Sequence, residues 1–209
     1  MRITVFGATG RTGVPFVRLA LEAGHEVVAH LRSPEKLPLD DHDRLTVVEG
    51  DVYTDEGVEE AVAGADAVVS LLGQGEGSPD DLLTVAGEHV TTAMAGHGVD
   101  RYVTLVGAGV REEGESPSIS GRVMGGLLKL LAREVLADAE EHVRRVRVTD
   151  LDWTVVRAPR LTEGEPTGYR AGDIDLGFES VSRADVAAFC LECIEEELYV
   201  GGMPKVGPE

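Results

Sequence analysis

Residues 2–13 decide the fold, and they read Arg2-Ile3-Thr4-Val5-Phe6-Gly7-Ala8-Thr9-Gly10-Arg11-Thr12-Gly13. The apolar run that ends at Phe6 predicts a buried strand. The amphipathic residues from Thr12 to Ala23, followed by Gly24, predict a helix. The glycines of this stretch therefore lie in a tight connection between a strand and the helix that follows it.

Each glycine of this connection has a predicted role. Gly7 can take the tight turn off the strand, Gly10 can let the backbone approach a diphosphate, and Gly13 can let the helix pack closely on the sheet. A diphosphate would lie at the helix N-terminus, where unpaired amides and the helix dipole favour an anion. Thr9 and Thr12 can add hydroxyl donors. The stretch predicts a dinucleotide site, and the alternative is a glycine-rich turn without a ligand.

Strand-like and helix-like runs alternate along the chain. Strands are predicted at 2–6, 26–31, 45–49, 65–72, 101–106 and 152–157, and helices at 12–23, 54–63, from 80 or 81 to about 95, 123–147 and 183–196. This order predicts an α/β Rossmann fold, a doubly wound parallel sheet with helices on both faces. Nothing in the 209 residues resembles a linker, so we expect one domain over 1–209.

Two stretches interrupt this alternation. Residues 107–121 are rich in Gly, Ser, Glu and Pro, and residues 159–179 contain several glycines and Pro166. Both are predicted to be loops, and each follows the C-terminal end of a strand, the edge where ligands bind in open α/β sheets. We therefore expect them to form the walls of a substrate pocket.

The end of the second strand indicates the kind of dinucleotide. A site selective for NAD places an acid about 20 residues past the glycine loop, on the ribose 2′-hydroxyl. Residues 27–34 contain no acid and offer Arg32 and Ser33, with Arg11 in the loop itself. A guanidinium can bind a 2′-phosphate in a bidentate fork, so NADP(H) is favoured over NAD(H). The alternative is that Arg32 is a solvated surface cation.

Further cofactor contacts are predicted where the third, fourth and fifth strands end. Asp51 could accept a hydrogen bond from the adenine amino group, or it could cap the turn into the next helix. The complete predicted cofactor site is Gly7, Thr9, Gly10, Arg11, Thr12, Gly13, Arg32, Ser33, Asp51, Val52, Leu72, Gly73, Val106 and Gly107.

The amino-acid composition limits the classes of partner that the protein is expected to bind. Thirty-eight acids against 19 bases give a net charge of −19, which would repel nucleic acid and anionic membranes. The chain has no apolar run typical of a signal peptide or a membrane span, so we expect a cytoplasmic protein. Sixteen arginines against three lysines, with scattered acids, favour adaptation to a high-salt cytoplasm, the alternative being an ordinary acidic protein. The sequence leaves the oligomeric state open, a homodimer included.

The spacing of the cysteines and histidines in the sequence does not indicate a metal or redox site. Cys190 and Cys193 fall at helical spacing on one face with apolar residues, so both sulfurs are predicted to lie in the core. The six histidines are dispersed, which predicts no zinc site. His142 stands among charged residues and is expected on a solvated helix face.

Several segments together resemble a known group, the atypical short-chain dehydrogenases of the NmrA-like and biliverdin reductase B (NADPH-dependent flavin reductase) type. The segments that carry the resemblance are 6–13, 50–52, His97-Gly98-Val99-Asp100 and Asp150-Leu151-Asp152-Trp153-Thr154-Val155-Val156-Arg157-Ala158-Pro159. The likeness covers nearly the whole chain. It implies NADP(H) binding and, in the reductase members, hydride transfer to flavins or tetrapyrroles. Other members of the group are redox-sensing regulators without turnover.

The chain departs from this group at its catalytic positions. No Tyr-x-x-x-Lys pair exists, because the residues four past the tyrosines are Gly57, Val106, Asp173 and Met203. Flavin reductases of the group carry a serine where this chain has Gly107, and a histidine where it has Arg160. The catalytic residues are therefore left unassigned.

The missing acid shapes the predicted reaction. Reduction of a simple ketone needs a positioned proton donor, whereas flavins and quinones delocalise charge and can take a proton from solvent. Gly107, Ala108 and Gly109 would admit a planar ring, although such glycines also suit a flexible turn. Arg157, Arg160 and Tyr169 could supply anionic or stacking contacts. We expect an NADP(H)-dependent reductase of a small conjugated acceptor, the alternative being a non-catalytic NADP-sensing regulator that binds a protein partner; sugar-nucleotide epimerase chemistry is disfavoured.

Overall fold

The structure, a computed structural model, describes residues 1–75, 77–112, 114–115 and 133–209. Its main sheet contains β1 (Arg2–Phe6), β2 (Glu26–Leu31), β3 (Leu45–Glu49), β4 (Ala67–Ser70), β5 (Arg101–Gly107), β6 (Asp152–Ala158), β8 (Tyr169–Gly172) and β10 (Lys205–Pro208). The strand order is β3-β2-β1-β4-β5-β6-β10-β8, and every pair is parallel except β10 with β8. The sheet grows from β1 through β2 to β3 on one side, and from β4 through β5 to β6 on the other, so the strand order reverses between β1 and β4. The α/β Rossmann fold predicted from the sequence is confirmed.

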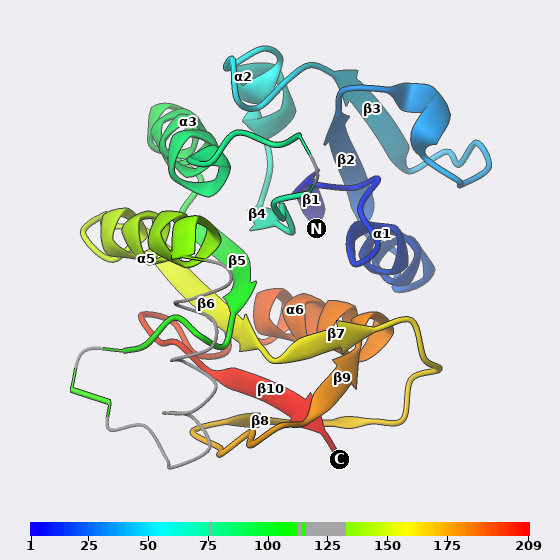
Figure 1. Ribbon diagram of the computed structural model, residues 1–209. Helices are drawn as coiled ribbons and strands as arrows, with labels where there is room; N and C mark the ends of the chain where they lie inside the picture. The colour runs from blue at the N-terminus through cyan, green and yellow to red at the C-terminus, as the bar shows by residue number, and fades with distance from the viewer. Residues whose placement is uncertain (76, 113, 116–132) are drawn as a thin grey trace.

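Helices cover both faces of this sheet (Figure 1). On one face lie α1 (Gly13–Glu22) and α6 (Arg183–Glu195), and on the other α2 (Val58–Val62), α3 (Leu82–His97) and α5 (Arg133–Val146). The central strands are apolar on both sides, so each face of the sheet buries its own cluster of mostly aliphatic side chains. Both sulfurs, of Cys190 and Cys193, lie buried in the α1/α6 cluster, as predicted.

The stretch 159–179 was expected to be one irregular loop, but in the structure it contains two strands. β7 (Arg160–Thr162) pairs with β9 (Ser180–Ser182) as a small separate sheet, and β8 extends the main sheet through β10. These strands are only three or four residues long, too short for a clear periodic pattern, and β10 contains Gly207 and Pro208. Their pairing comes from long-range contacts at the sheet edge, which local sequence does not encode.

Other boundaries differ by a few residues. The helix predicted from residue 54 begins only at Val58, because Asp55 and Gly57 adopt left-handed backbone conformations at φ 66° and 73°. The predicted strand 65–72 is shorter, and β5 includes Gly107. The predicted helix 123–147 is seen as α5, while residues 123–132 and the end of the 107–121 loop lie outside the described part. In the described part, no helix has the length and apolar character needed to cross a membrane.

His142 was wrongly expected on a solvated face, since only 2% of it is exposed. Its ring lies between α5 and α3, where α3 has Gly87: a Cβ built there would stand 2.3 Å from His142 Nδ1. The two helices can approach this closely because the position on α3 has no side chain. The charged residues around His142 in sequence lie on other faces of the helix, which explains the error.

Two glycines of α3 give a matched test of this packing. We expect Gly87→Ala to lower the free energy of unfolding by about 1–3 kcal/mol through overpacking against the His142 ring. Gly96→Ala, on the same helix with nothing within 4 Å of its Cβ, should raise it by about 0.5–1 kcal/mol. Urea denaturation of both variants measures the difference, and equal effects of the two changes would refute the contact.

Candidate functional site

The glycine loop joins β1 to α1 at the C-terminal edge of the sheet. Gly7 has φ +85°, and a Cβ there would lie 2.8 Å from the Leu71 carbonyl. A Cβ on Gly13 would lie 2.0 Å from the Gly7 carbonyl oxygen, so only glycine lets α1 start this close to β1. The amide of Gly10 donates to the same oxygen at 2.9 Å and closes the turn.

The start of α1 is prepared for an anion. Its N-cap residue, Thr12, makes no side-chain capping hydrogen bond, and the first turn contains no acid. At the start of α6, by contrast, the Ser182 hydroxyl accepts from the Asp185 amide, and Asp185 lies in the first turn. Within the first turn of α1 the Val14 amide donates to the Gly10 carbonyl at 2.9 Å and Pro15 has no N–H. The amides of Arg11, Thr12 and Gly13 donate to no backbone carbonyl of the described residues, so they and the positive end of the helix dipole are open to an anionic ligand. A cofactor diphosphate fits this place.

Arg11 joins the glycine loop to the second loop region. Its Nη1 lies 3.4 Å from Glu163 Oε1, and the same carboxylate oxygen lies 2.8 Å from Arg183 Nη1. Glu163 directly follows β7, so the pair brings residues 152 positions apart to one edge. Thr9 is exposed beside Arg11, whereas Thr12 is buried.

Arg32 follows β2 with 74% of its side chain exposed, and its Nη1 lies 4.0 Å from Asp51 Oδ2. Asp51 Oδ1 accepts from the Tyr53 amide at 3.0 Å, so this side chain does cap its own turn. The other carboxylate oxygen faces Arg32. Ser33 precedes a short 3-10 helix, Pro34–Lys36, and makes no capping bond to it.

The ends of β4 and β5 leave room for a ligand at the same edge of the sheet. Added Cβ atoms on Gly73 and Gly107 would meet no atom of the described residues within 4 Å, so that part of the structure leaves the backbone open to a ligand at both. Val52 and Val106 are buried at the same edge, with Leu72 partly covered. The Val52 carbonyl accepts from His89 Nδ1 at 2.8 Å, which fixes the segment after β3 against α3.

A buried carboxylate behind this edge was missed from the sequence. Asp138 of α5 accepts from the amides of Leu83 and Thr84 at 2.8 and 2.9 Å, and from Gln74 Nε2 at 2.8 Å. It thereby caps α3 from another helix, whereas Asp81, at the N-cap position expected for capping, makes no such bond. Asp138 and His142 are four residues apart on the apolar face of α5, and that spacing was the available signal.

Four titratable side chains have pKa values shifted further from neutral pH. His142 Nε2 lies 3.0 Å from Thr104 Oγ1, and burial lowers the pKa of His142 to about 4. Burial raises the pKa of Tyr102 to about 12. Burial, with the hydrogen bond to Glu192, also raises the pKa of Tyr169, and the hydrogen bond to Asp81 raises that of Tyr53. None of these three tyrosines has the lowered pKa that a phenolic acid uses at neutral pH.

The predicted pocket residues are brought to different places. Tyr169 packs on Phe189 with ring centroids 5.5 Å apart and donates to Glu192 at 2.6 Å, so its hydroxyl faces α6. Arg160 is exposed on β7. Arg157 is buried, and its Nε donates to the Met203 carbonyl at 2.8 Å. Ala108 and Gly109 follow β5 directly, and the Ala108 amide donates to the Ala158 carbonyl at 2.7 Å.

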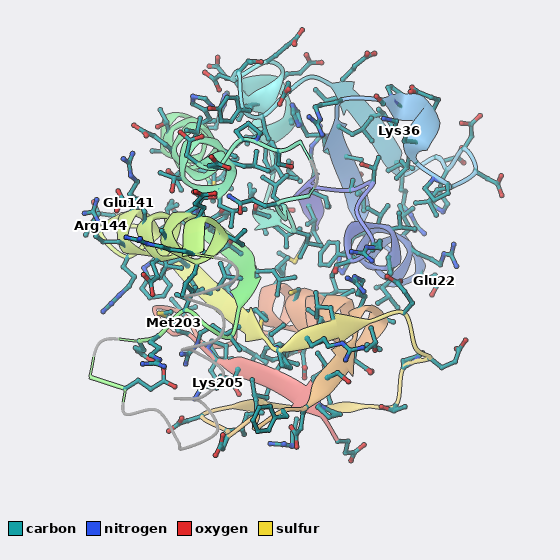
Figure 2. The ribbon with its side chains drawn as sticks, viewed as in Figure 1. Glu22, Lys36, Glu141, Arg144, Met203 and Lys205 are labelled. Atoms are coloured by element: carbon teal, nitrogen blue, oxygen red, sulfur yellow. The ribbon has the colours of Figure 1, made fainter. Side chains whose placement is uncertain are left out.

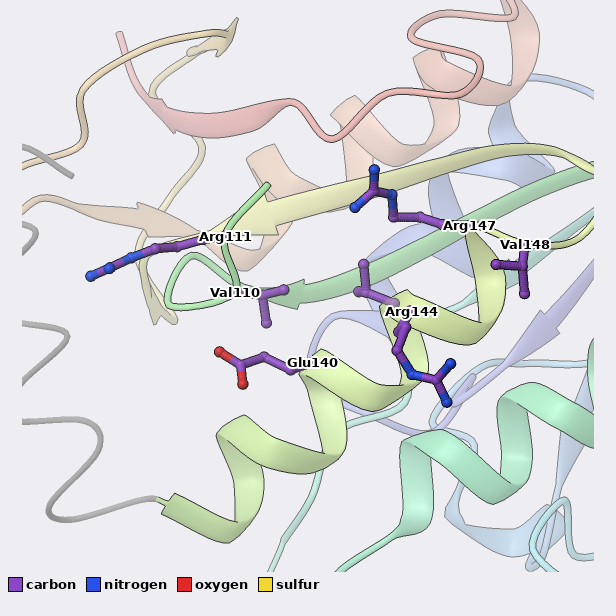
Figure 3. A pocket seen from close by; sticks show the side chains of 7 residues that line it. Val110, Arg111, Glu140, Arg144, Arg147 and Val148 are labelled. Atoms are coloured by element: carbon purple, nitrogen blue, oxygen red, sulfur yellow. The ribbon is translucent and has the colours of Figure 1, made fainter. Parts of the chain in front are cut away.

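A separate hollow lies along the outer side of α5. On this helix Arg144 Nη2 pairs with Glu141 Oε1 at 2.6 Å (Figure 2). Figure 3 shows the hollow between α5 and the segment after β5, lined by Val110, Arg111, Glu140, Val143, Arg144, Arg147 and Val148. None of these residues belongs to the predicted cofactor set. Among the described residues, no group of three His, Cys, Asp or Glu could hold a metal ion.

Comparison with known proteins agrees with this geometry. Residues 7–197 match the NAD(P)H-binding family. "Uncharacterized protein YwnB" of Bacillus subtilis is 27% identical over 185 residues, 87% of this chain and 81% of that protein. A match of 78 residues to a 3-beta-hydroxysteroid dehydrogenase of Mycolicibacterium neoaurum is 41% identical, but it spans 34% of this chain and only 21% of that enzyme.

Solved structures share the fold at low identity. A short-chain dehydrogenase/reductase of Veillonella parvula in complex with NADP is 20% identical with a TM-score of 0.78, over 99% of this chain and 94% of that one. ChuY, an anaerobilin reductase of Escherichia coli O157:H7, is 19% identical with a TM-score of 0.77, over 99% and 96%. The family match over most of the sequence confirms the expected NAD(P)-binding family, and the solved structures share its fold. The chain belongs to the NAD(P)H-binding family, and its Rossmann domain is one for a nicotinamide cofactor.

Proposed function

We propose that the protein is an NADP(H)-dependent reductase that transfers hydride to a flavin, quinone or similar conjugated acceptor. The observation that carries the proposal is the open start of α1, where uncapped amides and the absence of an acid suit a diphosphate. Open glycines at the ends of β4 and β5 continue the same edge. Together they leave a path for an extended dinucleotide across the point where the strand order reverses.

Preference for NADP(H) is supported by the charges beyond β2. Among the described residues, the exposed Arg32 has one ion pair, at 4.0 Å with Asp51, and pairs of this kind contribute about 0–1 kcal/mol. A ribose 2′-phosphate would offer the same guanidinium a stronger, bidentate partner. No acid stands on residues 27–34 to accept from a 2′-hydroxyl.

The choice of acceptor follows from the proton donors. Bound NADPH supplies a hydride, and reduction is complete when the acceptor takes one further proton. Since the pKa values of Tyr53, Tyr102 and Tyr169 are raised, a simple ketone would find no tuned acid among them. A conjugated acceptor spreads the added charge and takes its proton from solvent. The likeness in fold to an anaerobilin reductase supports an acceptor of this kind.

Replacing Arg32 tests the cofactor preference. Arg32→Ala should weaken NADPH binding by about 1.5–3 kcal/mol, the worth of hydrogen bonds to charged groups, and leave NADH binding unchanged. Arg18→Ala, which removes an exposed arginine from the outer face of α1, is the matched control and should alter neither. Titration calorimetry with both cofactors gives the four affinities. Equal losses of NADPH and NADH in Arg32→Ala would count against the assignment.

The reaction itself is tested by NADPH oxidation in high KCl against flavins, quinones and linear tetrapyrroles, with NADH in parallel. We expect acceptor-dependent oxidation with at least one of these classes, faster with NADPH. Tight binding of NADPH without oxidation across the panel would contradict the reductase, and it would favour the non-catalytic regulator instead.

A further inference from the structure

The positively charged side chains of Arg157 and Lys205 lie side by side at the C-terminal edge of the sheet, close to the end of β5. The register pairs Val106 with Arg157 and Arg157 with Lys205, so the three residues form one row across β5, β6 and β10. Neighbours in such a row point to the same face of a sheet. Only 3% of the Arg157 side chain and 15% of the Lys205 side chain are exposed.

One carboxylate holds both cations. Glu115, from the loop after β5, accepts from Lys205 Nζ at 2.5 Å through Oε1 and from Arg157 Nη1 through Oε2. Burial alone would raise the pKa of Glu115, but hydrogen bonds from Lys205 and Arg157 lower it to about 2. The next acid, Asp173, is fully exposed and lies 3.8 Å from Lys205. Glu115 is therefore the ionised partner of both groups at neutral pH.

The two cations keep donors to spare. Arg157 uses Nε for the Met203 carbonyl and Nη1 for Glu115 and the Val110 carbonyl, while Nη2 has no hydrogen-bond partner in the described residues. An ammonium has three N–H groups, and Glu115 takes one of those on Lys205. Lys205 is also one of only three lysines in a chain with a net charge of −19. An arginine and one of the few lysines are thus gathered beside an edge that is open to a ligand.

We propose that Arg157 and Lys205 form a subsite for a carboxylate or phosphate group of the acceptor, and that Glu115 fills this subsite when no acceptor is bound. The inference rests on the proposed reductase function and names a substrate class for it: conjugated acceptors that carry an anionic arm. Neighbouring strands are about 4.8 Å apart, so Lys205 lies two strands, roughly 10 Å, from Val106. An acceptor ring placed beyond Val106 could reach the subsite with a short side chain.

Exchange of Glu115 for a ligand anion is energetically reasonable. One anion replaces another, so neither buried cation loses its partner, which is the costly step in breaking a buried ion pair. Glu115 has 22% of its side chain exposed and belongs to a loop rather than to a strand, so it can turn into solvent. A phosphate or carboxylate can then bridge Nζ and the guanidinium with charge-assisted hydrogen bonds.

The first test uses inorganic phosphate as the probe, with saturating NADP+ so that the cofactor's own phosphate sites are filled. Glu115→Gln removes the internal competitor, and Glu112→Gln makes the same charge change on the same loop as its matched control. At constant ionic strength, phosphate should raise the melting temperature of Glu115→Gln by about 2–4 °C more than that of the wild type or Glu112→Gln. Equal responses of Glu115→Gln and Glu112→Gln would overturn the subsite.

The second test uses acceptors that differ only in their anionic arm. Riboflavin 5′-phosphate against riboflavin reports on phosphate, and a linear tetrapyrrole against its dimethyl ester reports on carboxylate. We expect fluorescence titrations to show preference for the anionic member of at least one pair, increased about tenfold by Glu115→Gln and abolished by Lys205→Met. A shift of both variants in the same direction would show that the cluster only holds the loop in place, and would reject the proposal.

These results separate the two proposals. A phosphate response in Glu115→Gln without NADPH oxidation by any acceptor would keep the subsite and remove the reductase function. Oxidation of NADPH by acceptors, with no difference between Glu115→Gln and Glu112→Gln, would do the opposite. If Lys205→Met does not fold, the Glu115 and Glu112 pair decides the question by itself.

Discussion

The close contact between the start of α1 and the end of β1 is the constraint on which the site depends. A side chain at Gly13 would lie 2.0 Å from the Gly7 carbonyl oxygen, and one at Gly7 would run into the backbone after β4. Without these side chains, the first turn of α1 begins directly beside the end of β1. The open amides of Arg11, Thr12 and Gly13 then lie at the edge where the strand order reverses, and the other candidate cofactor contacts extend from there along the same edge.

Arg11, Arg32, Arg157 and Lys205, which are proposed to meet ligands, are each paired with an acid in the structure. Arg11 is linked to Glu163, Arg32 to Asp51, and Lys205 with Arg157 to Glu115. The first two pairs are exposed and separated by 3.4 and 4.0 Å, so they hold their cations weakly. In a chain with twice as many acids as bases, such acids keep the edge from carrying unpaired positive charge. A phosphate or carboxylate group of a ligand would take the place of such an acid, so that one anion replaces another beside the cation.

Local sequence predicted the elements that position the cofactor. The strands 26–31 and 45–49 and the start of α6 at Arg183 were placed to the residue, because their apolar runs and turn residues are local signals. The glycine positions indicated the strand-to-helix turn for the same reason. The later strands β8 and β10 were not predicted, because four-residue segments containing glycine or proline become strands only by pairing with neighbouring strands.

The residues that support the site were harder to predict. Asp138 and His142 lie at helical spacing with buried aliphatic residues. The charged residues beside His142 in the sequence nevertheless favoured a solvated position for it, and Asp138 was not singled out. Their roles depend on where α3 starts and on how closely Gly87 lets α5 approach, which are properties of the packed molecule. The same holds for Arg157, whose burial beside Lys205 and Glu115 depends on β10 joining the sheet.

The most direct test of the account is an NMR titration of the 15N-labelled protein with NADP+. The account predicts that the backbone amides of Arg11, Thr12 and Gly13, at the uncapped start of α1, shift most and saturate together with binding. Saturable binding of NADP+ that leaves these three amides unchanged would contradict it, because the diphosphate would then lie elsewhere.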